Sequence, residues 1–307
     1  MSLIVSTSPH LRSRTDTATL MRDVVIALVP ALIASVIIFG FRSLLVVLVS
    51  VAAAVLTEYL FEKGCKKPVT IADWSAVVTG VILAYNLPVT IPLWQAALGS
   101  IIAILVVKQL FGGLGRNFAN PAIVARIVLF LSFSKTMTAW QFPDAVSSAT
   151  PLALMANGQM DALPSKLNLF LGMQGGCLGE VSALALLLGF AYLMIRGVIT
   201  WHTPVVFVGT VFLLSWAIGG SADYALCQVL SGGLLLGAIF MATDYVTTPS
   251  TKWGQVIFGL GAGLLTILIR QWGNYAEGVS FAILFMNILT PYISKWTWSK
   301  PFGGVAA

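Results

Sequence analysis

The chain has 307 residues, of which 58% are hydrophobic and only 9% are charged, whereas a soluble domain carries about 25% charged residues. This composition excludes a soluble fold. The net charge of +6 does not indicate a nucleic-acid partner, because the basic residues lie in short loops between apolar runs, where they orient a membrane protein. The three cysteines, Cys65, Cys177 and Cys227, form no CxxC pair, so the chain encodes neither a zinc site nor a complete set of iron–sulfur ligands.

Apolar runs follow one another from Val24 to Ile293. Crossing about 30 Å of hydrocarbon takes about 20 helical residues, and backbone groups in lipid must be paired internally, so we interpret these runs as helices. Because further runs follow the first one, it is not a secretory signal. The sequence predicts an all-α integral membrane protein of about ten transmembrane helices, at 24–41, 44–61, 74–87, 93–110, 121–133, 178–195, 204–218, 224–241, 256–272 and 279–293.

The basic residues also predict the orientation in the membrane. With the N-terminus in the cytoplasm, most Lys and Arg residues fall on the cytoplasmic side, as the positive-inside rule requires. Both termini are then cytoplasmic, and the one long extramembrane segment lies on the outer face. We therefore expect an N-terminal five-helix half at 1–133, an outer-face loop at 134–177 and a C-terminal five-helix half at 178–307.

The two halves resemble each other. A shift of 157 residues places Val77 to Pro92 on Leu234 to Pro249 without a gap, and the same shift places Asn117 on Asn274. Because five spans separate equivalent positions, the two repeats would have opposite orientations in the membrane. Inverted repeats are typical of transport proteins, whose binding sites lie between the repeats.

Glycines and asparagines gather at the cytoplasmic end of the fourth predicted span, at Gly112, Gly113, Gly115, Asn117 and Asn120. They do not form a Rossmann nucleotide site, because the GxGxxG spacing and a surrounding parallel sheet are both missing from the sequence pattern. One interpretation is a tight turn in which Pro121 opens the fifth helix. The other is an unwound segment, buried in protein, whose glycines admit a flat ring and whose asparagines offer amide donors and acceptors.

A run of small and hydroxyl residues in the outer loop leads to Thr150 and Pro151. As a purely structural feature, Thr150 would be the N-cap and Pro151 the first residue of a short helix that stops at Asn157 and Gly158. The run also resembles the flavin attachment motif Asp-x-x-Ser/Thr-Gly/Ser-Ala-Thr, on whose last threonine a transferase esterifies flavin mononucleotide (FMN) through its phosphate. Every specified position matches, through Asp144, Ser147, Ser148, Ala149 and Thr150.

The two interpretations of Thr150 are compatible, since a phosphate at the start of a helix meets free backbone N–H groups. The outer-face location of the loop also agrees with an exported flavin transferase. We therefore expect covalent FMN at Thr150.

The whole chain resembles one family of membrane subunits. The glycine and asparagine segment, the outer-loop Ser147-Ser148-Ala149-Thr150 and the segment from Met241 to Asp244 are similar to those of the RnfD/NqrB family. This family comprises the D subunit of the Rnf electron transport complex and the B subunit of the sodium-pumping NADH:quinone reductase. The lack of a long polar extension before Val24 is more similar to the Rnf protein. The resemblance implies covalent FMN at Thr150 and a second, noncovalent flavin, such as riboflavin, near Asn117 and Asn120.

Two charged residues near span ends have less specific roles. Asp244 lies near the cytoplasmic end of the eighth span, where an acid is often a helix terminus, while the family resemblance implies a role in cation passage. Arg126 lies about 7 Å into the fifth span by helical rise, and we expect it to snorkel back to the cytoplasmic surface without a catalytic role.

The resemblance thus implies a flavin-carrying subunit of an ion-translocating ferredoxin:NAD+ oxidoreductase complex in a prokaryotic cytoplasmic (inner) membrane. It relays electrons while the complex moves Na+ or H+, and it is not a complete enzyme alone. Its partners are the other subunits, the flavin transferase during maturation, and membrane lipid. Two alternatives remain: a channel or transporter with inverted repeats and no redox role, and a structural membrane subunit in which Thr150 only caps a helix.

Overall fold

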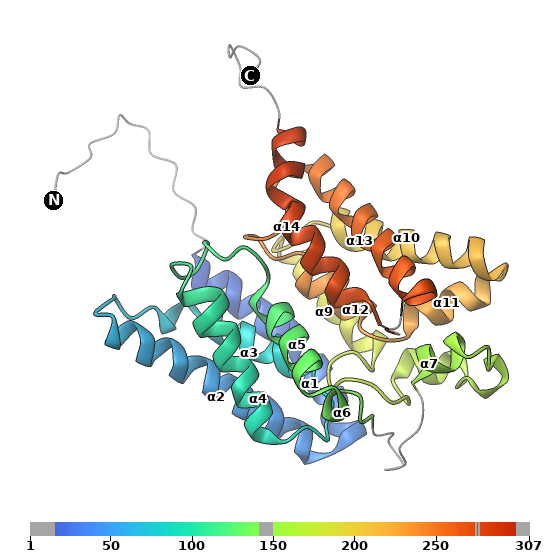
Figure 1. The fold of residues 1–307 in the computed structure, drawn as a ribbon, viewed down its shortest axis with the longest axis horizontal. Helices are drawn as coiled ribbons and strands as arrows, with labels where there is room; N and C mark the ends of the chain where they lie inside the picture. Colours follow the sequence, from blue (N-terminus) through green and yellow to red (C-terminus); the bar gives the residue numbers. More distant parts are fainter. Residues whose placement is uncertain (1–15, 141–149, 274, 276, 299–307) are drawn as a thin grey trace, which may run out of the picture.

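The computed structural model describes residues 16–140, 150–273, 275 and 277–298. These residues form a bundle of helices and contain no β-strand (Figure 1). The expectation of an all-α protein is therefore confirmed over the described part of the chain.

Each of the first five predicted spans coincides with a helical element. In chain order these elements are α1 (Thr17–Phe39), α2 (Phe41–Gly64), α3 (Ser75–Tyr85), α4 (Leu93–Ile101) with its continuation η2 (Ile102–Gln109), and α5 (Pro121–Ser132), and the short 3-10 helix η1 (Ile71–Asp73) precedes α3. Side-chain caps fix two of the starts, since Asp16 accepts a hydrogen bond from the backbone of Thr17 and Asn120 accepts one from Ala122.

In the described part of the connection between the two halves, the helices are short. These are α6 (Ser134–Met137), α7 (Pro151–Ala156), the 3-10 helix η3 (Met160–Ala162) and α8 (Lys166–Leu171). In Figure 1, α6 and α7 lie toward the opposite end of the bundle from the C-terminal end of α14.

The last five predicted spans also coincide with helices. These are α9 (Ala183–Ile195), α10 (His202–Gly219), α11 (Ala222–Leu230) followed by α12 (Leu234–Leu236) and η4 (Gly237–Met241), α13 (Lys252–Trp272), and α14 (Val279–Thr297). The eighth span is broken, because its two parts, Ala222–Leu230 and Leu234–Met241, are bent by 67°.

The helices support a multi-pass membrane protein. Four of them, α1, α2, α10 and α13, are long and apolar enough to cross a bilayer alone, and the bent pair would make a fifth span. Shorter apolar helices correspond to the third, fourth, fifth and sixth predicted spans. The number of complete crossings and the orientation in the membrane stay predictions.

The sixth predicted span begins later than expected, because residues 172–182 are not helical, although all of them except Met173 are buried. Glycines at 175, 176 and 179 weaken a helix there. The backbone is instead paired with the end of α3: Leu178 N donates to Leu87 O at 3.0 Å, and Gly179 N donates to Tyr85 O at 3.0 Å. Such a non-helical segment is tolerated at membrane depth only when protein surrounds it.

Two segments are wound as π-helices rather than α-helices, η2 in the first half and η4 in the second. In η2 and its end, Leu110 N donates to Leu105 O and Gly113 N donates to Lys108 O. Apolar periodicity does not distinguish α from π winding, so the sequence predicted a plain helix here. Short π segments are frequent at functional sites.

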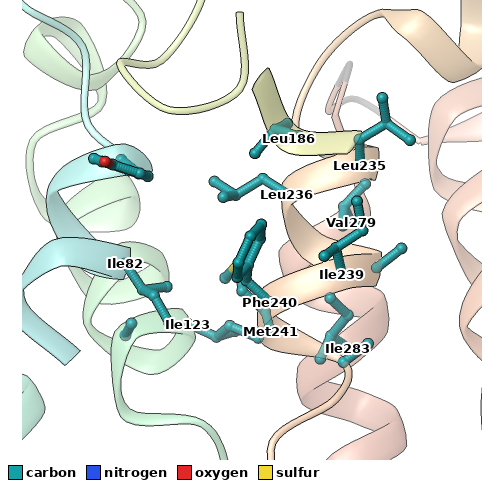
Figure 2. Close-up of a cluster of buried hydrophobic side chains, with 14 of the residues drawn as sticks. Ile82, Ile123, Leu186, Leu235, Leu236, Ile239, Phe240, Met241, Val279 and Ile283 are labelled. Carbon is teal, nitrogen blue, oxygen red and sulfur yellow. The ribbon is translucent and has the colours of Figure 1, made fainter. Parts of the chain in front are cut away.

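The hydrophobic core lies where the two halves meet. Helix α1 packs on α9, and α5 packs on α14. In Figure 2, Ile82 and Ile123 of the first half point toward Phe240 and Met241 of the second half, all of them buried. The division of the chain into inverted repeats stays a prediction. Two of the cavities described below, those lined by Thr150 and by Asn120, lie at the interface between the halves.

Candidate functional site

Thr150 lies on the wall of a cavity of about 230 Å³, here called the outer cavity. The rest of the wall comes from α5, from the segment after α6 and from the start of α14. The lining residues are Arg126, Ile127, Phe130, Thr138, Trp140, Thr150, Tyr275, Glu277, Gly278, Ser280 and Phe281. Elements from both halves of the chain therefore build this site.

The predicted local structure around Thr150 is confirmed. Thr150 is the N-cap of α7, its hydroxyl accepts a hydrogen bond from Ala153 N at 3.3 Å, and Pro151 is the first helical residue. The helix ends at Ala156, after which Gly158 has a φ of +73°. Because α7 has only six residues, its dipole contributes less than a long helix would. The other motif residues, Asp144, Ser147, Ser148 and Ala149, lie outside the described residues.

Aromatic rings form much of the cavity wall. Tyr275 and Phe281 stack with ring centroids 5.3 Å apart, and Phe130 meets Tyr275 edge to face at 5.4 Å. Trp140 and Thr138 line the same cavity as Thr150. Flat aromatic surfaces with a few polar groups are the surroundings that a planar, partly polar ring prefers. The residues present therefore fit the ring of a flavin.

Arg126 does not snorkel to the cytoplasmic surface, so that prediction is wrong. The residue is only 6% exposed, and its guanidinium donates to Asn86 Oδ1 at 3.0 Å, to Ser280 Oγ at 2.7 Å and to the Glu277 carboxylate. These partners are 40, 154 and 151 residues away in sequence. Helical rise measures depth along one helix and cannot show such partners on others.

Glu180 lies behind Arg126, on the buried segment 172–182. Its Oε1 accepts a hydrogen bond from Cys177 N at 2.8 Å. Its Oε2 is buried and has no hydrogen-bond partner among the described residues. Arg270 also reaches this region, since its Nε donates to Glu277 O at 3.1 Å and its Nη1 donates to Gln228 O at 2.7 Å. Acids and guanidinium groups from both halves thus meet beside the outer cavity.

A second, smaller cavity, here called the inner cavity, joins the remaining candidate residues. Its volume is about 90 Å³, and Asn117, Asn120 and Asp244 all line it. Lys108 of η2 and Phe240 of η4 line it as well, so both π-helices border the same space. Small-molecule pockets typically measure about 300–1,000 Å³, so the outer cavity, at about 230 Å³, is slightly below this range and the inner cavity is far below it. A flavin ring therefore does not fit the inner cavity in this arrangement unless side chains such as Leu114 move.

The glycines of the first-half segment do not line the inner cavity. Gly112, Gly113 and Gly115 have φ values of +116°, +95° and +86°, and a Cβ at Gly113 or Gly115 would meet no atom within 4 Å. Glycine is thus required for the backbone conformation of the turn rather than for space. A contact between these glycines and a flavin stays a prediction.

The asparagines have structural partners of their own. Asn120 caps α5 through Ala122 N at 3.0 Å, and its Nδ2 donates to Met241 O at 3.4 Å. Asn117 Nδ2 donates to Ala119 O at 3.0 Å. The interpretation of this segment as a turn before Pro121 is confirmed. The amide of Asn120 also joins the first half to the end of η4.

Asp244 stands between the inner cavity and a neighbouring cavity of about 270 Å³. Its Oδ2 accepts a hydrogen bond from the Thr247 hydroxyl at 2.9 Å. Burial raises the pKa of the Asp244 carboxyl above its ordinary value, and the hydrogen bond from Thr247 partly offsets this rise. Asp244 therefore borders two cavities, in addition to its hydrogen bond in the local turn.

Comparison with known proteins identifies the family. Residues 4–303 match the family described as NQR2, RnfD, RnfE. The chain belongs to this family. The resemblance predicted from the motifs is confirmed over almost the entire chain.

Curated relatives of this family are similar over nearly their full lengths. The chain is 46% identical to the D subunit of the Na(+)-translocating ferredoxin:NAD(+) oxidoreductase complex of Acetobacterium woodii, over 99% of this chain and 96% of that protein. It is 43% identical to the D subunit of the proton-translocating ferredoxin:NAD(+) oxidoreductase complex of Clostridium ljungdahlii, over 97% and 96% of the two chains. It is 37% identical to the D subunit of the ion-translocating oxidoreductase complex of Alcanivorax borkumensis, over 99% and 97%.

The structure brings together residues that the sequence motifs did not single out. Glu180 and Glu277 belong to no motif, and Cys177 belongs to no CxxC pair. One signal was present in the sequence: acids are rare in this chain, so Glu180 and Glu277 next to apolar runs needed partners. Which partners they have depends on how the halves pack.

Proposed function

We propose that this protein is the flavin-carrying membrane subunit of an ion-translocating ferredoxin:NAD+ oxidoreductase complex, with FMN esterified to Thr150. The observation that carries the proposal is the position of Thr150 on the wall of an aromatic cavity between the two halves. The names of the relatives in Acetobacterium woodii and Clostridium ljungdahlii support the same type of complex.

Each part of the outer cavity has a role in this proposal. The Thr150 oxygen holds the phosphate ester and so fixes the cofactor to the chain. Tyr275, Phe281 and Phe130 offer aromatic surface to the ring and exclude water from one side of it. The bound flavin supplies the electron-transfer chemistry, while the protein supplies position and electrostatic environment.

The proposal requires other subunits. The described residues contain no strand, so they form no Rossmann fold that could bind NAD+. We propose that partner subunits oxidise ferredoxin and reduce NAD+, and that a flavin transferase loads Thr150 during maturation. The protein would lie in a prokaryotic cytoplasmic membrane with both termini inside and Thr150 outside, surrounded by lipid.

The inner cavity is the second candidate for a flavin. We propose that a noncovalent flavin such as riboflavin binds near Asn117 and Asn120 when the loop before Pro121 opens. The supporting observation is that these amides, Lys108 and two π-helices converge on one space between the halves. An electron relay through the protein would then have one station near each face of the membrane.

Asp244 is the candidate for the path of the coupling ion. It contacts both the inner cavity and the neighbouring cavity, and a carboxylate at such a position binds Na+ or relays H+. A channel or transporter without a redox role is the alternative that this geometry also allows. That alternative has no use for an ester at Thr150.

In-gel fluorescence separates these functions. The chain is produced together with its flavin transferase, purified, denatured in detergent, and the protein band is examined under ultraviolet light. We expect flavin fluorescence on the band, its loss in Thr150→Ala, and its retention in Thr138→Ala, which changes another threonine of the same cavity. A dark wild-type band would refute the redox proposal, and a fluorescent Thr150→Ala band would place the attachment elsewhere.

A further inference from the structure

One basic and one acidic side chain face the outer cavity. Arg126 and Glu277 both line it, and their side chains are 8% and 23% exposed. They form an ion pair with each other. A positive and a negative group therefore stand together at the place where Thr150 would hold its cofactor.

The guanidinium of Arg126 is held rigidly. Two of its bonds, to Asn86 and Ser280, come from the ends of α3 and α14, and a third joins Glu277. The fourth goes to Cys177 Sγ at 3.7 Å, and a thiol is a weak acceptor. The first three bonds fix the orientation of the group, and its Nε donates to no partner among the described residues, so this N–H stays available to an acceptor in the outer cavity.

Arg126 also contacts a cluster of side chains of the kinds that bind metal ions. Ligand atoms of Cys177, Glu180 and Glu277 lie within 4.8 Å of one another. The guanidinium contacts two of these three residues. The guanidinium therefore supplies a positive charge beside this cluster.

A fixed positive charge has a specific effect on a redox ring. A flavin becomes more electron-rich on reduction, and its pyrimidine edge presents nitrogen and oxygen acceptors that a planar guanidinium matches with paired N–H donors. In a cavity of low dielectric constant, a nearby opposite charge stabilises the reduced form far more than it would in water.

Resting on the proposed function of Thr150, we propose that Arg126 is the positioning residue of the outer cavity, which binds the electron-rich edge of the flavin ring and raises its reduction potential. Glu277 partly neutralises Arg126 and so lowers the potential. The ion pair would set the potential of this station through the balance of the two charges.

The test uses the purified complex and a spectroelectrochemical titration. The signal of the outer flavin is defined as the difference between the wild type and Thr150→Ala, so that other flavins of the complex are subtracted. The variants are Arg126→Gln, Arg126→Lys and Glu277→Gln. The control is Arg196→Gln, which removes a guanidinium that is half exposed and paired with Asp23 away from the cavity.

We expect Arg126→Gln to lower the midpoint potential and Glu277→Gln to raise it. Each change should alter the ratio of reduced to oxidised flavin at a fixed potential by about tenfold, or about 30 mV for a two-electron couple. Arg126→Lys should keep part of the wild-type potential, because the charge stays while the planar fork is lost. Arg196→Gln should leave the potential unchanged.

The outcomes are distinguishable from a failure of the proposed function. If the wild-type band carries no flavin at Thr150, the proposed function itself is wrong. If flavin is attached but Glu277→Gln and Arg126→Gln shift its potential in the same direction, or leave it unchanged, the assignment of Arg126 is overturned. If Arg126→Gln does not fold, the sign of the Glu277→Gln shift still decides the question.

Discussion

The buried ion pair between Lys108 and Glu58 allows the sharpest test of the packing. Lys108 Nζ lies 2.6 Å from Glu58 Oε1, and the two side chains are 3% and 0% exposed. Ser75 Oγ also accepts a hydrogen bond from Lys108 at 2.6 Å. Gln109 donates to the same carboxylate oxygen of Glu58, whose other oxygen has no partner among the described residues. Among the described residues, Lys108 is the one cation that contacts the buried Glu58 carboxylate.

Changing Lys108 to Met would remove the cation and keep a similar volume. The remaining Glu58 carboxylate would be buried without compensation, which costs about 3–5 kcal/mol of unfolding free energy. A second change, Glu58→Gln, removes that charge while keeping the shape of the side chain. We expect the double variant to recover most of the loss, since replacing both members of a buried pair is often close to neutral.

The measurement is an unfolding titration with a denaturing detergent in mixed micelles, applied to the wild type, both single variants and the double variant. The coupling energy of this cycle isolates the pair from the general cost of each substitution. The reasoning is refuted if Lys108→Met costs less than about 1 kcal/mol, or if the double variant is no more stable than Lys108→Met alone.

Three further predictions concern the segments around the cavities. Gly179→Ala would place a Cβ 2.3 Å from Tyr85 Cβ and should cost about 1–3 kcal/mol in the same titration, whereas Gly209→Ala, whose Cβ meets nothing within 4 Å, should be neutral or stabilising. Asn120→Leu should release extractable flavin, and Asn120→Asp, which keeps the helix cap but loses the amide donor, should release it with the helix intact; unchanged flavin content in both would refute the inner site. Because the folded pKa of Asp244 is raised, its contribution to stability is present below its unfolded pKa and is lost as the pH rises through the folded pKa. Asp244→Asn should remove that loss, and an identical pH profile for the variant would contradict it.

The helices could be predicted because the free energy of placing apolar residues in lipid outweighs the other contributions to the structure of these segments. All ten apolar runs of the sequence coincide with helical elements. The predicted helix bounds are wrong where residues next to an apolar run do not form a helix. Residues 178–182 precede a long apolar run, yet Gly179 N donates to Tyr85 O and the chain stays non-helical until Ser182 caps α9.

The sites were predictable only where their information is local. The hydroxyl and small residues before Pro151 predict a capped helix, and Thr150 forms one. In contrast, the meeting of Arg126 with Glu277, and of Asn120 with Asp244 around one cavity, depends on packing between segments more than 120 residues apart. Neither the apolar periodicity nor the spacing of motif residues shows which distant segments pack together.

The central claim is that Thr150 carries FMN, and peptide mass spectrometry tests it most directly. Trypsin should release one peptide from Thr136 to Lys166, since no Lys or Arg lies between Lys135 and Lys166. From protein matured with its flavin transferase, we expect this peptide to be heavier by FMN less one water, with fragment ions placing the addition on Thr150. A peptide of unmodified mass, or an addition on Ser147 or Ser148, would contradict the account.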